Sequence, residues 1–184
     1  MRKILLIFLF LATFLEGQDL GTLRLEHYQT FLQTLAKKPK ETQLEQINLY
    51  FNSIVNEYDT HVWGAEDYWA TPDEFIARGS GDCEDFVIAK YKALESLGFD
   101  PKKMMIYIVK VQNERDYHAV LGVKNDLNQT LILDNLSWKI LPVEKRNDLN
   151  IVADVKKLSP TNTTNRLLLH VYQHYHALLE KLAK

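Results

Sequence analysis

The chain has a single cysteine, Cys83, and its position suits a nucleophile. Cys83 lies at the start of residues 82–97, whose apolar residues recur at helical spacing, with Gly98 placed to end the helix. The unpaired N–H groups and the dipole at a helix N-terminus stabilise a thiolate, the nucleophilic form of cysteine. A lone cysteine is also commonly an inert buried residue, so the assignment depends on suitable partners.

A cysteine nucleophile needs a general base and a group that orients the base, and His118 and Asp134 are the candidates. Residues 117–123 and 129–135 are expected to form a hairpin with a five-residue loop, in which Leu121 faces Leu131 and His118 faces Asp134. Directly opposed residues share a face and lie about 5 Å apart at Cβ. A four-residue loop would instead place the two on opposite faces. We therefore predict that Cys83, His118 and Asp134 are catalytic.

Helices must position the cysteine. Residues 22–36 look helical, and residues 42–58 are predicted to form a second helix because their apolar residues recur every three or four positions: Leu44, Ile47, Phe51, Ile54, Val55 and Tyr58. Residues 59–81 lack such a period and are expected to form a long structured loop, of the kind that is often functional. A last helix is predicted over residues 160–182.

The histidine and the aspartate belong to strands. Residues 104–112, 117–124 and 130–136 are rich in β-branched and aliphatic residues, with polar turns between them. Helices followed by an antiparallel sheet indicate an α+β fold, and we find no internal repeat or domain boundary.

The charge balance, the single cysteine and the apolar N-terminus exclude some classes of protein and favour an exported one. There are 22 basic and 24 acidic residues, so the formal charge is −2 and binding to nucleic acid is not expected. One cysteine excludes a disulfide within the chain and a multi-thiolate zinc site. Residues 1–17 begin with Arg2 and Lys3 and continue as an apolar run, which is typical of a secretory signal peptide. Residues 18–184 are then a single exported domain.

Several short motifs occur in an order that resembles a known family. They are residues 67–74 (DYWATPDE), 81–86 (GDCEDF), 90–91 (KY), 118–121 (HAVL) and 133–136 (LDNL), followed by Arg146 and Asp148-Leu149. Together they resemble the bacterial transglutaminase-like cysteine proteinases, of the LapG type that cuts large surface adhesins in the periplasm. The likeness covers about residues 45–155. It implies a papain-like, transglutaminase-like core with a triad at Cys83, His118 and Asp134.

The resemblance also implies a calcium site at the acidic residues beside the nucleophile, Asp82, Glu84 and Asp85. A physical argument agrees with it. Each carboxylate near the sulfur opposes thiolate formation by roughly 1–2 kcal/mol, which a helix dipole alone does not offset. A Ca²⁺ ion held by oxygen ligands would cancel that field. Alternatively, the three residues are solvated partners of the helix N-terminus.

The resemblance implies a calcium-dependent periplasmic cysteine endopeptidase that releases a large cell-surface adhesin and so controls biofilm attachment. The alternatives are a transglutaminase-like acyl transferase and a non-catalytic calcium-dependent binding module. The expected partners are the adhesin and an inner-membrane cyclic di-GMP receptor that sequesters the protease, and we expect a monomer.

The predicted chemistry assigns no definite role to one tryptophan and to a pair of histidines. Trp69 either lines the substrate cleft or anchors the core. His170 and His174 have the i, i+4 spacing of metal ligands, but no acidic residue beside them completes a metalloprotease motif, so we expect surface residues.

Overall fold

Helices precede a five-stranded antiparallel sheet, which confirms the α+β fold. The structure is a computed structural model that describes residues 19–183, so the predicted signal peptide lies outside the described residues. The helices before the sheet are α2 (Leu20–Leu35), α3 (Lys40–Asn52), α4 (Asp59–Val62), α5 (Pro72–Arg78) and α6 (Cys83–Ser96). The strands of the sheet and the last helix are β3 (Met104–Val111), β4 (Tyr117–Lys124), β5 (Thr130–Asp134), β6 (Ser137–Pro142), β7 (Leu149–Asp154) and α7 (Arg166–Leu182).

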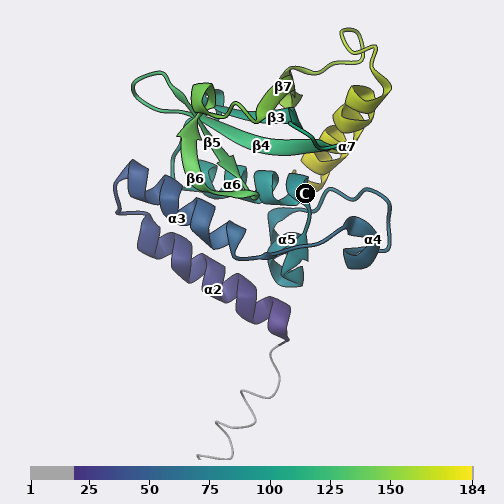
Figure 1. Cartoon of the computed structure of the whole chain (residues 1–184). Coiled ribbons are helices and arrows are strands. Elements are labelled where there is room, and N and C mark those ends of the chain that lie inside the picture. Colours follow the sequence, from purple (N-terminus) through teal and green to yellow (C-terminus); the bar gives the residue numbers. More distant parts are fainter. Residues whose placement is uncertain (1–18, 184) are drawn as a thin grey trace, which may run out of the picture.

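The sheet has the order β6-β5-β4-β3-β7, with every neighbouring pair antiparallel. One face of the sheet packs against α6 and α3, and α2 lies on the far side of these helices (Figure 1). The main core fills the space between the sheet and these helices. A smaller apolar cluster on other strand residues is centred on Val109, Val120 and Ile132. The edge strands β6 and β7 were not among the predicted strands.

Helix α6 runs beneath the sheet (Figure 1). Its first residue is Cys83. It buries Phe86, Ala89, Ala93 and other apolar residues against the sheet and its neighbouring helices. Gly98 follows the helix with φ +80°, the left-handed conformation that favours glycine at a helix end. The predicted helix over residues 82–97 is thus confirmed to within a residue at each end, with Asp82 as its N-cap.

The hairpin that carries the histidine has the predicted loop length but a different register. Leu121 pairs with Leu133 and Lys124 with Thr130, so the five loop residues are 125–129. Our predicted pairing of Leu121 with Leu131 was wrong by two residues, because the loop lies one residue further along the chain. Side chains alternate with a period of two along a strand. The error therefore left His118 and Asp134 on a common face.

Helix α3 ends at Asn52, not at residue 58 as predicted. Ser53 follows as the C-cap, and Val55–Asn56 form the short strand β1, which pairs in parallel with β2 (Ser80–Gly81). Val55 and Tyr58 are 59% and 73% exposed, so their apolar character misled the prediction. The early end of α3 turns the chain toward the residues just before Cys83.

Residues 59–81 contain the short helices α4 and α5, which the absence of a long apolar period concealed. Helix α5 begins with a capping box: the Thr71 hydroxyl accepts from the Glu74 N–H, and the Glu74 carboxylate accepts from the Thr71 N–H. Pro72 at the first helical position is also favourable. These helices hold the segment in place between α3 and α6.

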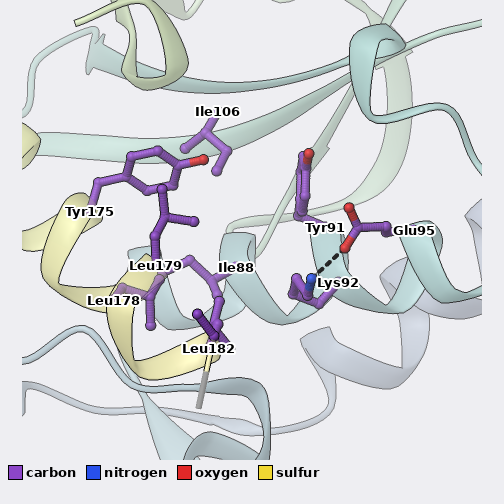
Figure 2. A pocket seen from close by; sticks show the side chains of 10 residues that line it. Ile88, Tyr91, Lys92, Glu95, Ile106, Tyr175, Leu178, Leu179 and Leu182 are labelled. Carbon is purple, nitrogen blue, oxygen red and sulfur yellow. Dashed lines mark hydrogen bonds and ion pairs between the residues drawn. The ribbon is translucent and has the colours of Figure 1, made fainter. Parts of the chain in front are cut away.

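Helix α7 begins at Arg166, six residues later than predicted, because Asn165 caps it by accepting from the Leu167 N–H. It packs beside α6 and β3. Side chains from these elements meet around a hollow, lined by Tyr175, Leu178 and Leu179 of α7, Ile88 of α6 and Ile106 of β3 among others (Figure 2). Its volume is about 210 Å³. Within residues 19–183, no helix is long and apolar enough to cross a membrane.

Candidate active site

Cys83 is half-buried at the first turn of α6, next to strand β4. Its thiol donates a hydrogen bond to Glu84 Oε2, with 3.2 Å between sulfur and oxygen. Burial, together with the negative charges of Glu84 and Asp82, raises the pKa of the Cys83 thiol well above its usual value. An Ala119 N–H directed at the sulfur acts in the opposite sense. Burial is the larger cause, and a reduction of the negative charge at Glu84 and Asp82 would lower this pKa.

His118 and Asp134 form a buried pair. His118 Nε2 lies 2.8 Å from Asp134 Oδ1, which leaves Nδ1 as the ring nitrogen that can serve another group. The second oxygen of Asp134 accepts from the Arg146 guanidinium at 2.8 Å, and the Leu136 N–H donates to Oδ1. Burial alone would raise the pKa of Asp134, but the His118 and Arg146 contacts outweigh it and hold that pKa at about 2. Asp134 is thus an ionised orienting group for the imidazole.

Polar side chains from two helices fix the backbone of Asp134. Asn52 Nδ2 donates to the Asp134 carbonyl at 2.8 Å, and Lys90 Nζ donates to Asn52 Oδ1 at 2.6 Å. Burial lowers the pKa of Lys90 to about 7. Arg146 also binds Asp148, which keeps its guanidinium directed at Asp134. Lys90 and Arg146 belong to the family motifs but were given no role, and Asn52 was not selected, because the residues that they contact are distant along the chain.

Cys83 and His118 line one cleft of about 160 Å³. Its other walls are largely apolar and come from the loop before α5, from strands β3 and β4 and from α7, and they include Trp69, Ile108, Tyr117, Leu167 and Val171. Trp69 is 6% exposed and packs in the main core, so it has both of the roles considered for it. The sulfur and the imidazole therefore face a common, largely apolar space.

The acidic residues beside the nucleophile form part of a larger cluster. Carboxylate oxygens of Asp59, Asp82 and Asp85 lie within 4.8 Å of one another, as do those of Asp59, Asp67 and Glu84. The three predicted metal-binding residues, Asp82, Glu84 and Asp85, are thus brought together with two that sequence analysis did not select. Both lie in the segment of residues 59–81, which was expected to be functional, and Asp67 also begins the motif of residues 67–74.

Close backbone packing creates this cluster. Asp85 Oδ1 accepts from the Ala70 N–H at 2.8 Å, and Asp59 Oδ2 accepts from the Tyr68 N–H, so both carboxylates tie down the loop before α5. A Cβ atom on Gly81 would overlap with Asp85 Oδ2 and the Phe75 ring. Glycine at this position therefore allows the start of α6 to approach α5.

The protonation equilibria of the cluster reflect burial and crowding of like charges. Burial is the largest cause of the raised pKa of Asp59, to about 6, and of Asp85, to about 8. Burial and the neighbouring charge of Asp82 raise the pKa of Glu84 well above its usual value, and burial raises that of Asp82. Such groups become ionised at neutral pH when a cation shares the site.

The donor set fits a hard divalent cation. Among the described residues, four buried carboxylate oxygens of this cluster have no hydrogen-bond partner: Asp59 Oδ1, Asp67 Oδ1, Asp82 Oδ1 and Asp85 Oδ2. A buried polar atom without a partner is costly, and carboxylate oxygens are the ligands that Ca²⁺ prefers.

Comparison with known proteins identifies relatives. A family model described as bacterial transglutaminase-like cysteine proteinase BTLCP matches residues 26–157. Legionella pneumophila LapG has a similar structure: TM-score 0.73, 30% identity, with 90% of this chain and 91% of that chain covered. Its EGTA-treated form gives a TM-score of 0.66 at 36% identity over 74% of each chain. Its calcium-bound form gives 0.68 at 30% identity, covering 87% and 93%. No curated protein sequence matches the chain.

Proposed function

The chain belongs to the bacterial transglutaminase-like cysteine proteinase family, and on that premise we propose that it is a calcium-dependent periplasmic endopeptidase that cleaves a large cell-surface adhesin. The observation that carries the proposal is the shared cleft of Cys83 and His118, with the imidazole held by Asp134 at 2.8 Å. Export is the proposed role of the signal peptide at residues 1–17.

In the proposed reaction, the Cys83 thiolate attacks the carbonyl carbon of the scissile peptide bond. The backbone N–H of Cys83 helps to stabilise the negative oxygen of the tetrahedral intermediate. The C–N bond then breaks, and the proton held by His118 passes to the leaving amine. Water, deprotonated by the same imidazole, hydrolyses the thioester and regenerates the thiol. Asp134 keeps the ring in the tautomer and orientation that both steps need.

Calcium is proposed to bind at the acidic cluster. Asp82, Glu84 and Asp85, with Asp59 and Asp67, would hold the ion, and its charge would offset the carboxylates that oppose the thiolate. The protein's own contribution is to fix the start of α6, through the Asp85 contact with Ala70. Support also comes from the likeness to LapG, which is known in a calcium-bound and an EGTA-treated form.

The adhesin substrate follows from the LapG-type resemblance and accords with the cleft. The largely apolar walls of the cleft suit apolar side chains of a peptide substrate. By the same resemblance, cleavage would release the adhesin and end biofilm attachment, and an inner-membrane cyclic di-GMP receptor would sequester the protease.

The test is direct cleavage. Residues 18–184 should be incubated in calcium with the periplasmic ends of candidate adhesins from the same organism, and the products weighed by mass spectrometry. We expect two fragments whose masses sum to that of the substrate plus one water, and no fragments with Cys83→Ala. Products that carry an added primary amine would indicate acyl transfer. An intact substrate in every mixture would contradict the proposed function.

A further inference from the structure

Helix α7 carries a histidine pair that the proposed peptidase reaction does not use. His170 and His174 are one turn apart, and their ring centroids are 4.2 Å apart. Sequence spacing alone left this pair without an acidic partner. The fold supplies one from the loop before α5: His170 Nε2 lies 2.7 Å from Asp67 Oδ2, and His174 Nδ1 lies 3.8 Å from Asp67 Oδ1.

The three side chains have the geometry of a small metal site. Their potential ligand atoms all lie within 4.8 Å of one another. The side chains are 48%, 29% and 31% exposed for His170, His174 and Asp67, so an ion can reach them from solvent. Asp67 Oδ1 is buried and has no hydrogen-bond partner within residues 19–183. That oxygen can therefore coordinate a metal ion without breaking a hydrogen bond.

We propose that Asp67, His170 and His174 form a binding site for a borderline transition-metal ion, with zinc as the best match. Two imidazole nitrogens and one carboxylate oxygen are ligands typical of zinc, whereas calcium prefers oxygen alone. Three protein ligands leave a fourth tetrahedral position for water. The site differs in ligand chemistry from the acidic cluster, and the two sites share Asp67.

The position of the site gives it a structural consequence. His170 and Asp67 line the same cleft as Cys83, and Leu167 and Val171 of α7 form part of the wall. Trp69, two residues after Asp67, packs near His174 with 6.3 Å between ring centroids. A zinc ion would thus join α7 to the loop before α5 and fix one wall of the cleft.

Zinc also binds catalytic thiols, so the test uses a Cys83→Ala background. Zinc chloride is titrated into this protein in calcium-saturated buffer without chelator, in competition with a chromophoric zinc indicator. We expect one zinc ion per chain, with affinity at least about tenfold weaker after His170→Ala or His174→Ala. The matched control is His176→Ala, since His176 lies on the same helix but packs against Tyr172.

Thermal unfolding gives a second measurement. At zinc about a hundredfold above the dissociation constant, we expect the melting temperature of the Cys83→Ala protein to rise by about 5–10 °C. The rise should persist in His176→Ala and vanish in His174→Ala. His174→Asn, which keeps a polar side chain, serves if His174→Ala does not fold. Equal zinc affinity in the histidine variants and their parent, or loss of binding in Cys83→Ala itself, would overturn the proposal.

Discussion

His118 Nε2 lies 2.8 Å from Asp134 Oδ1, although the two residues are not paired in the β4–β5 ladder. His118 pairs with Val109 on the other side, in the β3–β4 ladder. The last β5 residue that pairs with β4 is Leu133. The contact is therefore diagonal across the end of the hairpin. Arg146, from the segment between β6 and β7, holds the far oxygen of Asp134 at 2.8 Å and completes the arrangement.

Removing the nucleophile or the base should abolish cleavage. We expect Cys83→Ala and His118→Ala each to lower the rate of adhesin cleavage by at least about 10³-fold, because each step of the proposed reaction uses both groups. The rate of fragment formation measures the effect. Cys83→Ala should keep its melting temperature, and undiminished cleavage by this variant would show that another residue is the nucleophile.

Asp134→Asn should be less damaging to activity than loss of the base, because the imidazole remains with poorer orientation. The variant should be less stable, by about 2 kcal/mol in the free energy of unfolding, because the buried Arg146 loses one charged partner and keeps Asp148. Urea denaturation and the cleavage rate give the two values. Asp126→Asn is the surface control, and an Asp134→Asn protein as stable as that control would contradict the assigned contact.

Chelation should switch the peptidase off. We expect EGTA to suppress cleavage and calcium to restore it better than magnesium, which gives up its water ligands reluctantly. Asp82→Ala, Glu84→Ala and Asp59→Ala should mimic chelation and abolish the rise in melting temperature that calcium causes in the wild type. The exposed neighbour Glu66→Ala is the control. Full activity in EGTA would instead indicate that the acidic residues only stabilise the N-terminus of α6.

The acidic cluster should also give a pH dependence of stability in EGTA. Burial raises the pKa of Asp59 to about 6 and of Asp85 to about 8, above the value of about 4 in an unfolded chain. The folded chain then binds more protons, so the free energy of unfolding should fall as the pH rises from 5 to 6.5. Burial lowers the pKa of Lys90 to about 7, so at higher pH this residue makes the free energy of unfolding rise with pH. The comparison therefore stops at pH 6.5.

Urea denaturation at the two pH values, with EGTA and with saturating calcium, tests this dependence. Calcium binds the ionised carboxylates, so its stabilisation should grow over the same interval. Asp85→Asn should flatten the profile in EGTA, whereas Glu66→Gln should not. A profile in EGTA that is already flat in the wild type would contradict the raised pKa values.

Calcium should lower the pKa of the nucleophile. Burial and the charges of Glu84 and Asp82 raise the pKa of Cys83, and a cation at the acidic cluster opposes the contribution of those charges. The rate of Cys83 alkylation, measured against pH with and without calcium, gives the apparent pKa directly because this is the single thiol of the chain. We expect a lower apparent pKa with calcium. The same pKa with and without calcium would show that the ion does not influence the thiol.

Local patterns in the sequence were enough for the individual elements that carry the chemistry. The apolar period of residues 82–97 and Gly98 located α6 and its cysteine to within a residue. Runs of β-branched and aliphatic residues located β3, β4 and β5, and the polar run between the last two gave the correct loop length. Such patterns depend on contacts between residues close in sequence, which is why they can be interpreted without the fold.

Tertiary structure decided what these elements bring together. Only the fold shows that α3 ends at Asn52, that the chain then carries Asp59 and Asp67 to the start of α6, and that Arg146 reaches Asp134. The contact between Asp67 and His170 joins residues 103 positions apart in the chain. Long-range contacts of this kind depend on the packing of whole helices against a sheet, and no local period of polar and apolar residues encodes them.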